Sequence, residues 1–201
     1  MPKLKLTKAE LKAQREALHR YQRFLPTLQL KKEMLQSEVR RAEDELAAAH
    51  QELDAMHSEI ETWISLFAED VGLEDLLRVH TVDIHRINIA GVTVRKLDSL
   101  DFEPIVPDFA TTPPWVDFAL ERMKNILRLR LQEELISEKL EVLRTELRTA
   151  TQRVNLFEKI KIPDCRENIR IIRIALGEEQ TAAIARAKLA KSKTQEWRSG
   201  A

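Results

Sequence analysis

The chain has 201 residues, of which one third are charged, 5% are aromatic and four are glycine. A compact globular domain of this length carries more aromatic and turn residues, so the composition favours long helices. Lys and Arg balance Asp and Glu at 33 each, which argues against general nucleic-acid binding. A single cysteine, Cys165, excludes a disulfide and a cysteine-based zinc site within one chain. No run of 18 apolar residues occurs, so we expect no direct membrane insertion.

Residues 1–75 predict an N-terminal coiled-coil arm. From Leu35 to Phe67 the apolar positions are separated by alternating steps of four and three residues, which is the period of a coiled-coil seam. We expect the helix to run from about Thr7 to about Val71. Pro26 interrupts the arm, and we expect it to kink or restart the helix. The predicted seam residues of this arm are Leu35, Val39, Leu46, Leu53, Met56 and Ile60.

Residues 76–111 form a connector of different character, rich in β-branched residues, which predicts one short β-hairpin. Ala90-Gly91 and Asp98-Ser99 are both candidates for turns. An isolated hairpin is barely stable in water, so this one should rest on the coil or on a partner. The predicted hairpin residues are Val82, Ile84, Ile87, Ile89, Gly91, Val92 and Val94.

Residues 112–190 predict a C-terminal coiled-coil arm, with Thr112 as the helix N-cap and prolines in the first turn. Steps of four and three residues mark a second seam from Ile136 onward. We expect Pro163 to break this arm, and Asp164 to cap a further helix. Residues 191–201 are expected to be a basic, flexible tail. The predicted seam residues are Leu140, Leu143, Leu147, Val154 and Phe157.

The two arms have similar lengths and flank a compact connector, so the economical fold is one chain doubling back on itself. The predicted class is all-α dominated, a long two-stranded antiparallel α-helical coiled coil with a β-hairpin connector. Counting back from the connector places Leu46 opposite the region of Glu141. Both termini then lie at the same far end, and both are basic. The basic residues are Lys3, Lys5, Lys8, Arg186, Lys188, Lys191 and Lys193.

The sequence carries no recognisable catalytic pattern. Neither a glycine-rich phosphate loop nor a nucleophile elbow occurs. His50 and His57 are seven residues apart, each with an acidic residue four positions later, and solvated ion pairing beside the seam explains this spacing better than metal binding. We therefore expect no enzyme activity, no metal and no cofactor. A homodimeric coiled-coil scaffold or tethering protein, or a helical hairpin that binds nucleic acid through its basic end, remain alternatives.

Several stretches of the sequence resemble a known family. Residues 152–163 read Gln-Arg-Val-Asn-Leu-Phe-Glu-Lys-Ile-Lys-Ile-Pro, and an isoleucine-rich stretch at 169–172 and Leu-Gly-Glu-Glu-Gln at 176–180 follow. Residues 25–35 supply a Leu/Lys-rich first helix, and residues 88–92 read Asn-Ile-Ala-Gly-Val. In this order they resemble the D subunits of the V-type and archaeal-type rotary ATPases, in their bacterial form. Residues 184–191 depart from the Phe-Arg-Leu-Lys-Lys run of many relatives.

The resemblance implies a non-catalytic central-stalk rotor protein. Such a rotor transmits torque between a hexamer of A and B subunits, where the nucleotide chemistry lies, and a membrane ring that moves H⁺ or Na⁺. It implies that the basic residues at the termini face the hexamer. The implied partners are the A and B subunits, the F subunit along the shaft, and a funnel-shaped subunit above the proteolipid ring, with no nucleic acid. The implied location is cytoplasmic and peripheral to the membrane, within the complex.

Overall fold

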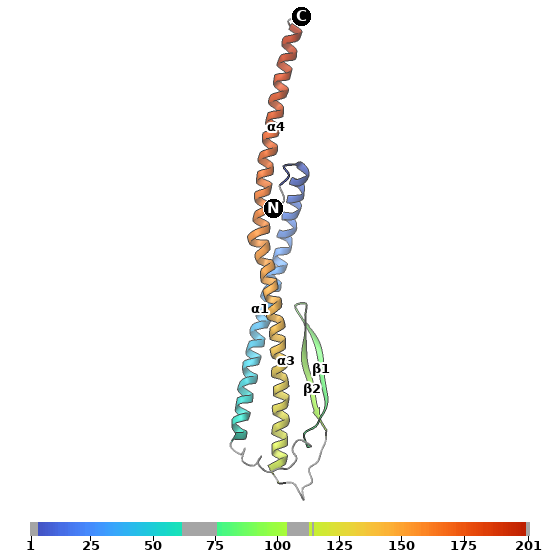
Figure 1. The fold of residues 1–201 in the computed structure, drawn as a ribbon, viewed down its shortest axis with the longest axis vertical. Helices are drawn as coiled ribbons and strands as arrows, with labels where there is room; N and C mark the ends of the chain where they lie inside the picture. Colours follow the sequence, from blue (N-terminus) through green and yellow to red (C-terminus); the bar gives the residue numbers. More distant parts are fainter. Residues whose placement is uncertain (1–3, 62–75, 104–112, 114, 200–201) are drawn as a thin grey trace. The chain divides into compact units, whose positions relative to one another are not determined.

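The computed structural model describes residues 4–61, 76–103, 113 and 115–199, and most of these are helical (Figure 1). The elements in chain order are α1 (Lys8–Glu61), β1 (Val79–Ile89), β2 (Val92–Phe102), α3 (Trp115–Asn155), the π-helix η2 (Leu156–Lys161) and α4 (Ile162–Ser199). The chain divides into two compact units. Unit 1 comprises Met1–Leu30 with Ala150–Ala201, and unit 2 comprises Lys31–Thr149.

Helix α1 begins at Lys8, where Thr7 caps it by accepting a hydrogen bond from the Glu10 backbone N–H at 3.2 Å. The helix passes through Pro26 without interruption, so the expected restart is wrong. Proline removes one backbone donor, but the half-buried Leu25 and Leu28 keep the flanking turns packed. The expected continuation to Val71 lies outside the described residues.

In unit 2, α1 and α3 form an antiparallel pair, which confirms the predicted fold class. Leu35 on α1 and Leu143 on α3 are fully buried. Advancing along α1 from Glu43 to Glu59 moves the partner back along α3 from Arg144 to Arg122, as antiparallel pairing requires. Glu45 bonds Lys139, within one turn of the predicted partner region.

Unit 1 holds a second antiparallel pairing, between the first part of α1 and the segment from Ala150 onward. The Tyr21 and Phe157 rings lie 5.0 Å apart between centroids, and the Asn168 side-chain amide donates to the Gln14 side-chain oxygen at 3.5 Å. The buried apolar residues of α4 are Ile162, Cys165, Ile169 and Ile172.

Pro163 does not break the C-terminal arm, because α3, η2 and α4 follow one another without a gap. The expected cap at Asp164 is therefore not a helix start, and that residue lies in the first turn after η2. Ile162 N–H donates to Phe157 O, the five-residue bond of a π-helix, immediately before the proline. A π-turn widens the helix at the position where the proline ring would otherwise crowd the preceding carbonyls.

The π-helix also corrects the phase of the seam. Buried positions on either side of it are Val154 and Ile162, which are eight residues apart, one more than a heptad. If this stretch were a regular α-helix, the extra residue would turn the buried face of α4 away from α1 by about 100°. The π-turn absorbs that residue and keeps the buried face of α4 against α1 in unit 1.

The connector contains the predicted antiparallel hairpin, with β1 and β2 of 11 residues each. Its turn lies at Ala90 and Gly91, which have φ of 52° and 84°, and Gly91 N–H donates to the Asn88 side-chain oxygen at 3.0 Å. The second turn candidate, Asp98-Ser99, is wrong, because both residues lie within β2. The register shifts there between the pairs Asp83↔Ser99 and Ile84↔Leu97, so Asp98 is the extra residue of a β-bulge.

Helix α4 continues past Gly177 to Ser199, and residues 181–195 are all exposed. The stretch from 191 to 199 is therefore helical. The flexible character expected of residues 191–201 stays a prediction.

Candidate functional site

The hairpin rests on α3 within unit 2 through strand β2. Arg95 binds Glu138 through two nitrogens, with Nε 2.9 Å from the carboxylate oxygen, and Arg128 donates to the Leu100 carbonyl at 3.3 Å. Lys124 lies 5.8 Å from the centroid of the Phe102 ring. Helix α3 of the coiled coil therefore supplies the support that a two-stranded sheet needs.

The predicted hairpin residues fall into three groups by burial. Val92 and Val94 of β2 are buried, and Ile87 and Ile89 of β1 are half-buried. Val82 and Ile84 of β1 are exposed, and Gly91 is exposed at the turn. Strand β2 therefore provides the packing, while much of β1 faces outward.

Ion pairs join α1 to α3 along the whole described length of unit 2. Lys139 is the most buried participant, with 13% of its side chain exposed, and it lies 2.9 Å from Glu45. His50 Nε2 lies 2.9 Å from Glu133 of α3, so its partner is on the other helix and is not the acidic residue four positions later on α1. Each exposed pair contributes only about 0–1 kcal/mol, so their value lies in fixing register along two helices. The cross-helix pairs are Lys31–Glu146, Arg144–Glu43, Lys139–Glu45, His50–Glu133 and Arg122–Glu59.

The predicted seam residues all lie inside one or other helix pair. Buried members are Leu35, Val39, Leu53, Leu140, Leu143 and Val154, and half-buried members are Leu46, Met56, Ile60, Leu147 and Phe157. The predicted seam residues do not include four buried residues of α4 that continue the seam. They are Ile162, Cys165, Ile169 and Ile172, which are spaced by three, four and three residues.

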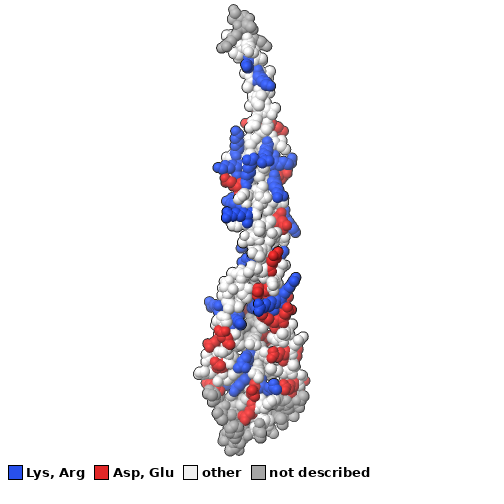
Figure 2. Space-filling model, turned by 180° about the vertical axis from the view of Figure 1, so that it is seen from behind, with Lys and Arg blue, Asp and Glu red and all other residues white. Residues whose placement is uncertain are grey.

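Charge is divided between the two units. Unit 1 has 18 Lys and Arg against 8 Asp and Glu, whereas unit 2 has 15 against 25. Figure 2 shows one face, on which Lys and Arg gather over the paired helices of unit 1, while both signs mix over unit 2. Each unit thus offers a field of one predominant sign to an approaching molecule.

The basic residues that were predicted to share one end of the fold, at the two termini, are only partly close together. Lys5 and Lys8 are exposed at the start of α1, and Lys3 lies outside the described residues. Within unit 1, α4 continues beyond the start of α1 (Figure 1), so its basic residues lie further along than Lys8. These exposed residues are Arg186, Lys188, Lys191 and Lys193.

Cys165 is the free thiol of unit 1, and it lies buried in the seam of α4. Burial raises the pKa of its thiol, the neighbouring Asp164 carboxylate raises it further, and Lys161 opposes both. At pH 8 the thiol therefore stays protonated, and only the thiolate is a nucleophile.

We expect iodoacetamide to alkylate Cys165 at least roughly tenfold more slowly at pH 8 in the native chain than in urea. The rate should rise as pH increases, because the thiolate fraction grows. Mass spectrometry of quenched time points measures both. A matched control carries Cys165→Ser with Ala182→Cys, which places a thiol on the exposed part of α4. Equal native rates for the two cysteines would contradict the prediction.

The described residues offer no metal-binding centre. No cluster of three or more His, Cys, Asp or Glu side chains among them has the geometry to hold an ion. In the same part of the chain, no helix is long and apolar enough to cross a membrane. What the described geometry provides is a pair of clamped helices, a docked hairpin and a projecting basic helix.

Comparison with known proteins gives one consistent answer. Residues 10–192 match the family model that describes the D subunit of ATP synthase. The chain is 41% identical over 192 residues to the V-type ATP synthase D subunit of Borreliella burgdorferi, covering 96% of this chain and 95% of that protein. It is 34% identical to the V-type ATP synthase D subunit of Chlamydia muridarum (96% and 97% covered) and 31% identical to that of Chlamydia pneumoniae (94% and 92%).

Proposed function

The chain belongs to the family of ATP synthase D subunits, in its V-type form, and from this membership we propose that it is the non-catalytic rotor shaft of the complex. It transmits torque between the catalytic hexamer of A and B subunits and the ion-translocating ring in the membrane. The paired termini sit in the hexamer, and the hairpin end points toward the membrane. The chain is cytoplasmic and peripheral to the membrane, held there by the complex.

The observation that carries this proposal is the clamping of two helices against each other. In unit 2 a torque applied to α3 acts on α1 through five ion pairs and a buried seam, so neither helix can turn alone. In unit 1 the same role falls to the Tyr21–Phe157 contact and the buried isoleucines. Two wound helices resist twisting better than one, because each helix restrains the rotation of the other.

The partners follow from the family and from the charges. The A and B subunits surround the shaft, the F subunit binds along it, and a funnel-shaped subunit meets its lower end. The basic residues Lys3, Lys5 and Lys8 and those of α4 face the hexamer as adaptable side chains, because a turning shaft cannot depend on one fixed set of contacts. Each contributes little alone, about 0–1 kcal/mol, so their effect on association is cumulative and weakens with salt.

A single-molecule experiment tests the rotor assignment. Ala55 is exposed on α1, so Ala55→Cys in a Cys165→Ser background offers one biotin site for a bead. With the A/B hexamer fixed to a surface, ATP should drive rotation of the bead in one direction. Active ATP hydrolysis beside a bead that only fluctuates would refute the proposal.

Solution mass tests the alternative of a homodimeric scaffold. The rotor requires a folded chain of 23.3 kDa that sediments as a monomer, since its seam is satisfied within one chain. A stable dimer whose cysteine crosslinks form only between chains would support the scaffold instead.

A further inference from the structure

Both helical arms of unit 1 depart from regular α-helical hydrogen bonding at nearly the same level. On α1, Pro26 has no backbone N–H, so the bond that a residue there would make to the Gln22 carbonyl is missing. On the other arm, η2 has the wider bonding of a π-helix, and Pro163 follows it directly. The Tyr21 and Phe157 rings meet between these two places. Both irregular turns therefore lie within about 8 Å of that contact along the coil.

The packing between the two helices is also thin at this level. None of the residues of η2 is buried, and both Leu156 and Ile160 are exposed. On the opposite helix, none of the described residues of α1 within unit 1 is buried, and Phe24 is exposed. The buried residues of α1 all lie in unit 2. A small movement of the two helices against each other at η2 would therefore uncover little apolar surface.

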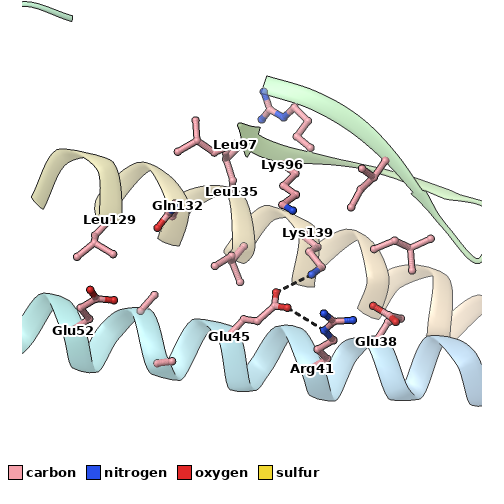
Figure 3. Close-up of a pocket in the computed structure, with 16 residues that line it drawn as sticks. Glu38, Arg41, Glu45, Glu52, Lys96, Leu97, Leu129, Gln132, Leu135 and Lys139 are labelled. Atoms are coloured by element: carbon pink, nitrogen blue, oxygen red, sulfur yellow. Dashed lines mark hydrogen bonds and ion pairs between the residues drawn. The ribbon is translucent and has the colours of Figure 1, made fainter. Parts of the chain in front are cut away.

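Ion pairs across the helices distinguish unit 2 from unit 1. In unit 2, Glu45 binds Arg41 on its own helix and Lys139 on α3 (Figure 3), and further pairs cross between the helices above and below it. In the described part of unit 1, each ion pair lies within a single helix, where it does not oppose twisting of that helix against its neighbour. These pairs are Lys12–Glu16 and Glu167–Arg170.

We propose that η2 and the turn of α1 at residues 22–26 together form a joint, at which the two helices of unit 1 bend and twist more readily than those of unit 2. Prolines and π-turns are the places where long helices bend. In this chain one of each lies at the same level of a helix pair that is thinly packed there. Beyond the joint, the buried residues Ile162, Ile169 and Ile172 keep the seam closed. The joint does not depend on the rotor function.

Distances between spin labels measure bending in the purified full chain. In a Cys165→Ser background, Gln152→Cys with Arg170→Cys places labels at exposed sites on either side of η2. Arg130→Cys with Arg148→Cys gives a matched pair in unit 2, also exposed and also eighteen residues apart. Each pair spans about 27 Å of helix and removes one ion pair within a helix. Double electron–electron resonance should give a wider distance distribution for the pair that flanks η2.

Two variants then remove the irregular turns. Pro26→Ala restores the missing N–H on α1, and deletion of Lys159 in a Pro163→Ala background removes the extra residue of η2. Each should narrow the distribution of the label pair that flanks η2 and leave that of the α3 pair unchanged. Thr27→Ala, at an exposed site beside the retained proline, should leave both distributions as they are. Circular dichroism confirms that each variant is folded.

Hydrogen exchange gives an independent measurement of the same joint. After correction for intrinsic rates, the amides of residues 157–162 should exchange at least about tenfold faster than those of residues 140–145 in α3, which corresponds to about 1.4 kcal/mol of opening free energy. The deletion variant should remove most of that difference. Equal widths for the two label pairs, a width that either straightening variant leaves unchanged, or equal exchange of the two segments would overturn the proposal.

Discussion

Leu143→Asp should unfold unit 2 under conditions in which the native chain is fully folded. Leu143 has no exposed surface, and the buried residues of α1 are all apolar. An aspartate there would either carry an unpaired charge into the seam or be protonated at a large cost in free energy. We expect the free energy of unfolding to fall by at least about 4–5 kcal/mol, at the extreme of single substitutions. Urea denaturation followed by far-ultraviolet circular dichroism measures the change.

The adjacent residue provides the control for this substitution. Val142 is 37% exposed on the same turn of α3, so Val142→Asp introduces the same charge outside the seam. It should change the free energy of unfolding by less than about 1 kcal/mol. Leu143→Ala should fall between the two, at about 2–5 kcal/mol. Similar melting curves for the two aspartate variants would show that the seam is not where α1 and α3 hold together.

Deleting one residue from η2 should be tolerated, whereas deleting one residue just beyond it should disrupt unit 1. In a Pro163→Ala background, removing Lys159 leaves Val154 and Ile162 one heptad apart, so a regular α-helix would still direct Ile169 and Ile172 at α1. Removing Arg166 instead places Arg170 and Arg173 where those isoleucines lie. The first deletion should change the free energy of unfolding by about 1 kcal/mol or less, and the second should cost more than about 3 kcal/mol.

The two deletions are matched, because each removes one exposed basic residue from the same helical segment. The Pro163→Ala background removes the ring that would clash in a regular helix. Hydrogen exchange of α4 residues 162–176 reports the packing directly, since those amides should stay protected only in the Lys159 deletion. Equal loss of protection in both deletions would show that the π-helical geometry of η2 is itself required, and that its role is not only to accommodate one extra residue.

The helix pairing could be predicted from the sequence because its signal is local and repeated. The heptad spacing of Leu35, Val39 and Leu53 is enough to predict the seam on the first arm. The spacing of Leu140 and Leu143 does the same on the other arm. Given two such stripes and a connector, antiparallel pairing and its approximate register follow. The eight-residue step from Val154 to Ile162 was also present in the sequence, and it would have indicated an inserted residue.

The restart expected at Pro26 and the break expected at Pro163 are wrong, because those predictions considered only the local cost of a proline and not the packing around it. Pro26 and Pro163 each remove a backbone hydrogen bond, but packing on both sides keeps the helix continuous. Asp98-Ser99 has turn chemistry, yet pairing of Ser99 with Asp83 extends the strand and leaves a bulge in place of a turn. The sequence predicts that the hairpin rests on the coil or on a partner, but it does not predict which residues make the contact, since Arg95 and Glu138 are 43 residues apart and no local pattern links them.

Antiparallel pairing also sets an order of events during synthesis of the chain. Glu59 and Arg122 are 63 residues apart, but Gln14 and Asn168 are 154 apart. Closing the shorter loop first costs less chain entropy, and each contact that forms shortens the loop that the next contact must close. Pairing should therefore proceed from the connector toward the termini. At roughly 5–20 residues per second, about 8–30 s separate the emergence of Gln14 from that of Asn168. Throughout that interval the apolar face at the start of α1 has left the ribosome without its partner, which makes nascent α1 a natural client for chaperones.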